Sequence, residues 1–324
     1  MDFKLYKPYL LKFQSLIALF ILCLAISLLS DKFLTVANGW NVMRQISVNV
    51  CISVGMTLVV LTAGIDLSVG SVLAFGGAVT AGLLRNGIEL ASTNTFIGFT
   101  VLGAILAGLL IGAVLGVFNG WIITKFKVPP FVATLAMLTI ARGLTLLYTQ
   151  GFPISGLGSS FAFIGTGWFL SVPVPVWISA FVVLIAVVIT NKTRLGRYIY
   201  AIGGNENASR LSGINIKQVK IIVYGIAGFL AALGGIMVTS RLDSAQPNAG
   251  MSYELDSIAA VVIGGTSLSG GRGTIMGTVL GAIIIGVLNN GLVLLNVSPF
   301  WQQVVKGAVI LLAVIIDKSN SKSE

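Results

Sequence analysis

The sequence predicts an all-α membrane protein with about ten transmembrane helices, an internal repeat and both termini in the cytoplasm. Of its 324 residues, 56% are hydrophobic and only 9% are charged, whereas about a quarter of the residues in a soluble domain are charged. Apolar runs of about 20 residues, the length that crosses a bilayer core, recur between short polar stretches. The Lys and Arg residues gather on alternate connections, as the positive-inside rule requires.

Apolar runs between polar stretches define the predicted spans. The eighth is short, which is typical of a broken or re-entrant helix whose backbone is covered by protein or by a water-filled path. With a cytoplasmic N-terminus, Lys32, Arg85 and Arg241 fall clearly outside, Arg142 and Lys306 fall within spans, and most other basic residues lie inside. The predicted spans are 16–30, 42–62, 67–84, 96–124, 129–149, 173–190, 218–240, 254–268, 274–295 and 300–316.

These spans use nearly the whole chain, so residues 1–324 are predicted to form one transmembrane domain embedded in membrane lipid. The net charge of +10 does not indicate a nucleic-acid partner, because the basic residues lie between apolar runs. Histidine is absent, and Cys23 and Cys51 lie inside apolar segments without metal-ligand spacing. No phosphate-binding GxxxxGK[ST] motif occurs. We therefore expect no cofactor, no metal and no ATP hydrolysis by this chain.

An internal repeat is indicated by two copies of the pattern G-x-x-L-S-x-G, at residues 64–70 and 265–271. Asn119 and then Pro129 follow the first copy, as Asn289 and then Pro299 follow the second. The predicted halves are about 42–149 and 218–316. Repeated halves are common in transporters, with the substrate path near the repeat interface.

Four glycines recur every four residues along the fourth predicted span. Gly108, Gly112, Gly116 and Gly120 therefore lie on one helix face, where they allow another backbone to approach closely. We interpret this face as a helix-packing surface, with a partner in this chain or in a second subunit.

Asp66 is an acid between two spans with no basic neighbour. One interpretation is a proton or sodium site, since an ionisable group within the membrane is a functional candidate by default. The interpretation we favour is a helix cap: Asp66 and Ser68 stand at the start of the third span, where a carboxylate accepts unpaired backbone N–H groups.

Uncharged polar residues within the spans are candidates for a path taken by a neutral, hydroxyl-rich solute. Hydrogen bonding between helices is an equally ordinary role for them. Near the start of the eighth span, Glu254 and Asp256 give a mildly acidic outer surface, either a solvated loop or a docking surface for a soluble partner. The candidate path residues are Asn49, Thr57, Asn119, Asn289 and Asn290.

The longest polar stretch, about 191–217, is predicted to be cytoplasmic. Asn205 or Asn207 is suited to cap a short helix through Ala208 and Arg210 that ends near Gly213. Such a helix would lie parallel to the membrane and fit a groove in a partner.

Three long stretches resemble the permeases of bacterial ABC sugar importers: TLVVLTAGIDLSVGS at 57–71, TRLGRYIYAIGGNENASRLSGIN at 193–215 and SAQPNAGMSYELDSIAAVVIGGTSLSGG at 244–271. The similarity covers nearly the whole chain. It implies a multi-pass protein of the bacterial inner membrane that moves ribose or a similar sugar by alternating access. It also implies a second permease copy in a homodimer, a periplasmic sugar-binding protein and a cytoplasmic ATPase subunit with two cassettes.

The resemblance further implies a cytoplasmic coupling helix that sits in a groove of the ATPase. The family pattern Glu-Ala-Ala, three residues, Gly becomes Asn207-Ala208-Ser209 followed by Gly213, with the acid displaced to Glu206. The resemblance places the coupling helix in the region 203–216. The candidate coupling residues are Asn205, Glu206, Asn207, Ala208, Ser209, Arg210, Gly213 and Ile214.

Other classes of protein remain as alternatives. An ion-coupled secondary sugar transporter would use Asp66 as its ion site and need no ATPase. An integral-membrane enzyme would need a nucleophile and base or a metal constellation, neither of which is evident. A membrane anchor would leave the long cytoplasmic connection unexplained.

Overall fold

The computed structural model describes residues 3–90 and 95–321, and helices make up most of this length. A helix lies at each of the predicted spans, and three shorter helices, α6, α8 and α9, lie between them. The helices are α1 (Phe3–Leu29), α2 (Val36–Leu61), α3 (Val69–Asn86), α4 (Val101–Phe126), α5 (Pro130–Thr149), α6 (Ser159–Thr166), α7 (Val174–Lys192), α8 (Arg194–Gly204), α9 (Glu206–Leu211), α10 (Ile216–Leu242), α11 (Tyr253–Ile263), α12 (Ile275–Leu294) and α13 (Pro299–Ser321).

Within the described residues, six helices are long and apolar enough to cross a membrane: α2, α4, α5, α7, α10 and α12. The 26 residues of α2 extend about 39 Å, more than the roughly 30 Å of a hydrocarbon core. By contrast, the 11 residues of α11 extend only about 16 Å. The eighth predicted span is thus short, as expected. Crossing by the other predicted spans stays a prediction.

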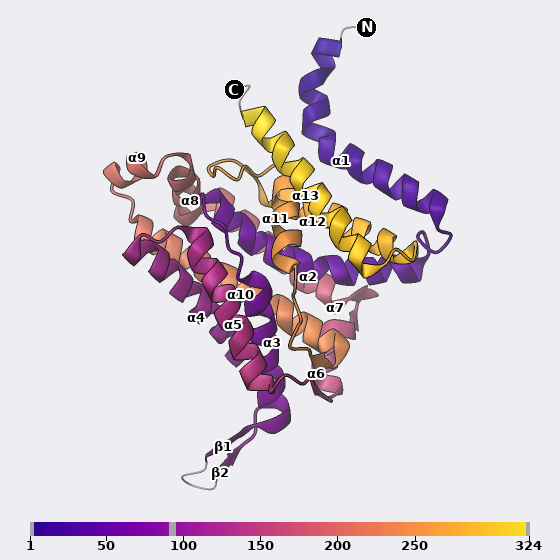
Figure 1. Cartoon of the computed structure of the whole chain (residues 1–324), viewed down its shortest axis with the longest axis vertical. Helices are drawn as coiled ribbons and strands as arrows, with labels where there is room; N and C mark the ends of the chain where they lie inside the picture. The colour runs from indigo at the N-terminus through magenta and orange to yellow at the C-terminus, as the bar shows by residue number, and fades with distance from the viewer. Residues whose placement is uncertain (1–2, 91–94, 322–324) are drawn as a thin grey trace.

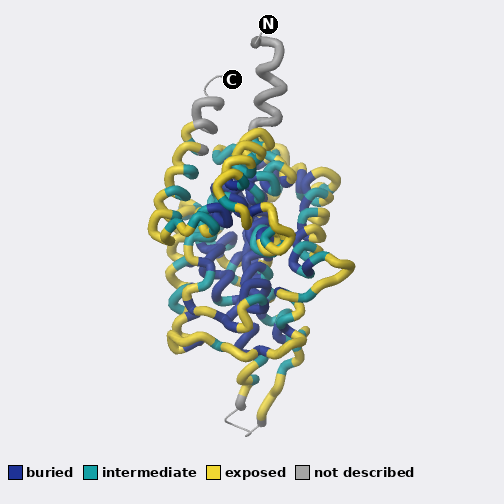
Figure 2. The backbone as a smooth tube through the Cα atoms, turned by 90° about the vertical axis from the view of Figure 1, so that its right-hand side faces the viewer, coloured by how far each residue is buried: buried dark blue, intermediate teal, exposed yellow. Residues whose placement is uncertain are grey.

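Two central helices, α2 and α10, hold much of the core. α10 packs against α2, α3 and α4, and α11 packs against α2, α12 and α13. Figure 2 shows the buried residues gathered in the middle of the helix assembly and the exposed residues around them. Many exposed side chains are apolar, among them Leu147, Phe181 and Phe300. Such an outer surface is the one that lipid requires.

The glycine face of α4 is a packing surface within the same chain: Gly108 packs against α3, and the other three glycines pack against α10. A Cβ atom at Gly112 would collide with the carbonyl oxygen of Gly228, and one at Gly116 would collide with the backbone of Tyr224. At Gly120 a Cβ would lie 2.7 Å from the Cα of Ile221. The small residues therefore bring the two backbones together.

Three pairs of short antiparallel strands were not predicted. β1 (Ile88–Leu90) pairs with β2 (Thr95–Ile97), β3 (Ile154–Ser155) with β6 (Ser244–Ala245), and β4 (Trp168–Phe169) with β5 (Val172–Pro173). Strands of two or three residues are too short to carry a recognisable period. The β1–β2 hairpin lies at the end of the molecule opposite α8 and α9, whereas α1 begins and α13 ends on the α8–α9 side (Figure 1).

Candidate functional site

The polar stretch after α7 folds as two helices, α8 and α9, and α9 occupies the place predicted for a short helix. Asn205, not Asn207, is its N-cap: the Asn205 Oδ1 atom accepts the backbone N–H of Ala208 at 2.9 Å. Gly213 follows with a φ of 81°, a conformation that glycine adopts without steric cost. Leu211, the last residue of α9, is 90% exposed to solvent.

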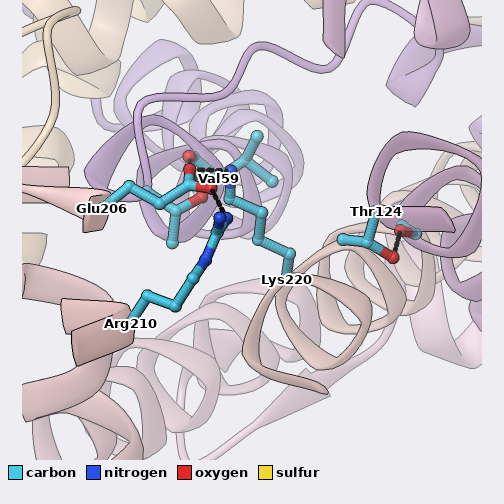
Figure 3. A network of polar contacts seen from close by, with 7 residues as sticks. Val59, Thr124, Glu206, Arg210 and Lys220 are labelled. Atoms are coloured by element: carbon cyan, nitrogen blue, oxygen red, sulfur yellow. Dashed lines mark hydrogen bonds and ion pairs between the residues drawn. The ribbon is translucent and has the colours of Figure 1, made fainter. Parts of the chain in front are cut away.

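Glu206 ties α9 to the base of α10. Its carboxylate accepts from Arg210 Nη2 at 3.2 Å and from Lys220 Nζ at 2.7 Å. Figure 3 shows both cations converging on this carboxylate. The Lys220 side chain is only 15% exposed and that of Arg210 is 63% exposed, so the Lys220 pair is the less screened of the two. The acid displaced from the family pattern thus anchors the short helix.

The C-terminal end of α8 is locked onto the core. A side chain at Gly203 would collide with the carbonyl oxygen of Leu61, the last residue of α2. Gly271 donates its backbone N–H to that same oxygen at 3.1 Å, and Tyr200 donates its hydroxyl to the carbonyl of Gly273 at 2.8 Å. The α8–α9 unit therefore contacts α2 and the α11–α12 loop directly.

Asp66 is buried in the connection between α2 and α3. Its Oδ1 atom accepts the backbone N–H of Ser68 at 2.9 Å and the Ser68 hydroxyl at 2.6 Å, and Asn119 Nδ2 donates to that hydroxyl at 3.0 Å. Ser68, rather than Asp66, is the N-cap residue of α3. Burial raises the pKa of Asp66, and the two hydrogen bonds from Ser68 oppose this shift.

Three of the five candidate path residues join helices to one another. Thr57 lies 2.7 Å from Thr278, oxygen to oxygen, and links α2 to α12. Asn290 exchanges two hydrogen bonds with Asn38, at 3.0 and 2.9 Å. Asn119, as described, holds Ser68. These side chains are occupied in the interhelical hydrogen bonding that was the alternative interpretation.

The other two candidates, Asn49 and Asn289, meet in one polar cavity of about 100 Å³. There Asp256 of α11 accepts from Lys306 Nζ of α13 at 3.0 Å and from Asn289 Nδ2 at 3.3 Å. The Oδ1 atom of Asn289 is buried without a hydrogen-bond partner. The cavity is lined by Gln45, Asn49, Tyr253, Asp256, Asn289, Val293, Gln302 and Lys306.

The prediction that Asp256 belongs to an acidic outer surface is wrong, because its side chain is 5% exposed and paired with Lys306. Sequence reasoning placed Lys306 within a span but named no partner for it. A cation inside an apolar run needs one, since an unpaired charge in lipid costs several kcal/mol. The two residues lie 50 positions apart in the sequence, so no local pattern could reveal the pairing.

The family comparison matches residues 39–314 to a model described as "Branched-chain amino acid transport system / permease component". This match spans most of the chain, including α8, α9 and the polar cavity. The chain belongs to this family. As a permease component it is a transport subunit and a multi-pass protein of the inner membrane.

Among curated proteins, the chain is 52% identical to the ribose import permease protein RbsC of Escherichia coli strain K12 over 96% of this chain and 95% of that protein. It is 53% identical to the ribose import permease protein RbsC of Bacillus subtilis strain 168 over 96% and 94%. The D-allose transport system permease protein AlsC of Escherichia coli strain K12 is 40% identical over 91% and 88%. No solved structure matches.

Proposed function

We propose that this permease carries ribose inward as the membrane subunit of an ATP-driven importer. The observation that carries the proposal is the identity of about half with two ribose permeases over nearly the full length of both chains. This identity is higher than the identity to the allose permease. ATP hydrolysis is assigned to a separate cytoplasmic subunit with two cassettes. A periplasmic binding protein delivers the sugar, and a second permease copy completes the translocation path.

The proposed topology has ten crossings with both termini in the cytoplasm, on the side of α8 and α9. The basic residues of the 191–217 stretch support this orientation. The start of α1 and the end of α13 also lie at the same end of the molecule as α8 and α9 (Figure 1). The β1–β2 hairpin and α6 then face the periplasm, where the binding protein docks.

The coupling element in this proposal is α9, which fits a groove of the ATPase through its exposed side. When the cassettes close, the displacement passes from α8 to the end of α2 at Leu61, because Gly203 leaves no room between them. Asn49 lies about 18 Å farther along α2. One rigid helix thus connects the cytoplasmic surface with the polar cavity.

The polar cavity is proposed as the point at which the path contacts sugar hydroxyls. Amides of Asn49 and Asn289 offer both donors and acceptors, and the unpartnered Oδ1 atom of Asn289 is ready to accept a hydroxyl proton. A volume of about 100 Å³ holds roughly three waters, so the helices around it must part to admit a pentose. Such parting is what alternating access requires.

Co-purification from the native membrane tests the proposal. We expect a double-cassette ATPase to accompany the chain, and ribose-loaded binding protein to stimulate its hydrolysis. Recovery of the ATPase without stimulation by ribose would retain the importer and reject the sugar. Transport by the chain alone, driven by a proton or sodium gradient, would reject the importer.

A further inference from the structure

A wide cavity lies at the predicted cytoplasmic surface and is distinct from the polar cavity within the membrane. Its volume is about 600 Å³. The connection between α4 and α5 forms one wall, and the segment from α9 into α10 forms the other. Lys127 and Val128 belong to the first wall, and Glu206, Ile214 and Lys217 belong to the second.

The cavity carries an excess of positive charge. Four cations, Lys127, Arg210, Lys217 and Lys220, line it against the single carboxylate of Glu206. Glu206 is already bound by Arg210 and Lys220. Within the described residues, Lys127 and Lys217 make no ion pair. Two ammonium groups therefore face the cavity without an anion.

The helix end beside the cavity carries side chains typical of a membrane interface. Just before Lys127 on the same helix end, Lys125 Nζ stands 4.6 Å from the ring centroid of Trp121 and 5.4 Å from that of Phe126. The two rings meet edge to face at 5.4 Å. Aromatic residues and lysines with apolar stems gather where lipid headgroups meet the hydrocarbon.

The walls are also partly apolar, with Ile123 and Ile216 buried and Val128 and Ile214 half-buried. An acidic protein surface would gain little from such walls. A ligand that joins an anionic group to an apolar body matches both parts of the lining. Basic cavities between transmembrane helices on the cytoplasmic side have this chemistry for acidic lipid headgroups.

We propose that this cavity binds the phosphate headgroup of an anionic phospholipid, with Lys127 and Lys217 as its principal contacts. The bound lipid bridges the α4–α5 connection and the base of α9. The site does not depend on the identity of the transported sugar, and its binding is measured on this chain alone.

Native mass spectrometry of the full detergent-solubilised chain tests the site, with phosphatidylglycerol and phosphatidylcholine of identical acyl chains as probes. The unsubstituted chain should retain phosphatidylglycerol in preference to phosphatidylcholine. The double variant Lys127→Gln/Lys217→Gln should bind phosphatidylglycerol about 30-fold more weakly, given the usual contribution of each basic residue at a membrane surface. Each single variant should fall between the two.

The matched control is Lys192→Gln/Arg194→Gln, which removes two exposed cations of the same face outside the cavity. It should bind phosphatidylglycerol as the unsubstituted chain does. If both double variants lost phosphatidylglycerol binding equally, the binding would depend on surface charge in general, and the proposal would be overturned. Displacement of the lipid by millimolar inorganic phosphate would assign the cavity to free phosphate instead. Lost ATPase association with unchanged lipid binding would assign it to an acidic protein surface.

Discussion

Lys306 of α13 places its ammonium nitrogen 3.0 Å from the carboxylate of Asp256 on α11, inside an apolar helix assembly. Asn289 of α12 donates to the same oxygen atom. Three helices therefore meet at one carboxylate. Charges buried in lipid are costly unless they are paired. We therefore regard this cluster as the strongest candidate for a functional role within the membrane domain.

Breaking the ion pair on one side should destabilise the protein strongly. Removing one partner of a buried pair costs about 3–5 kcal/mol, and we expect Asp256→Leu to fall near the lower end because the Lys306 side chain is 23% exposed. The double variant Asp256→Leu/Lys306→Met should recover most of the thermal stability in detergent. It should still fail to take up ribose, because the polar lining is lost.

Full uptake by that double variant would make the pair purely structural and remove the cavity from the path. A double variant no more stable than Asp256→Leu would instead mean that the Asp256–Lys306 pair is not what stabilises this region.

The candidate path residues should separate into two classes. Thr57→Val removes a hydrogen bond between α2 and α12 worth roughly 0.6 kcal/mol in a membrane protein, so uptake should stay within about twofold of the unsubstituted chain. Asn289→Leu keeps the side-chain size but removes both polar atoms from the cavity, and uptake should drop at least about tenfold, as expected when a site loses a sugar hydrogen bond. Initial rates of ribose uptake in vesicles, corrected for protein amount, measure both. The reverse order would place the path beside Thr57.

Two substitutions of Gly213 test whether its left-handed backbone conformation positions α9 for coupling. A Cβ there meets no atom within 4 Å, so the backbone conformation, with a φ of 81°, is the constraint. Gly213→Val forces a β-branched residue into that region at about 1–3 kcal/mol, which should displace α9 and uncouple ATP hydrolysis from transport. Gly213→Asn tolerates the left-handed region and should keep the coupling. If both variants couple normally, α9 is not the coupling element.

Asp66 predicts a pH dependence of stability. Because burial raises its pKa in the folded state above the ordinary value of 3.8, the folded protein holds this proton more tightly than the unfolded chain. Stability should therefore fall as the pH rises from the unfolded to the folded pKa. Asp66→Asn keeps an oxygen that accepts both Ser68 donors, so this fall should be absent when thermal melts are compared over a pH series above 3.8. ATP-driven uptake should persist, whereas its loss together with ion dependence would favour an ion site.

Sequence reasoning found the features that repeat or that lie close together in the chain. The ten apolar runs, the short eighth helix, the glycine face of α4 and the short helix before Gly213 all follow from local composition and spacing. The internal repeat stays a prediction, as do the homodimer and the candidate roles of the coupling residues.

Pairings between distant segments were beyond that reasoning. Asn49 and Asn289 share a cavity although 240 positions separate them, whereas Thr57 and Asn290 look equally polar in the sequence and are bound elsewhere. A helix pattern reveals the apolar face but not which polar residue meets which. For the same reason Asp256 was assigned to the outside, since its cation lies on α13.

Ribose uptake into proteoliposomes tests the central claim most directly. The chain would be reconstituted with its co-purifying ATPase so that the ATPase faces the lumen. ATP would be enclosed in the lumen, and ribose-loaded binding protein would be added outside. We predict accumulation of ribose that requires both ATP and the binding protein and that is unaffected by collapsing proton and sodium gradients. Accumulation that needs an ion gradient and continues without ATP would contradict the account.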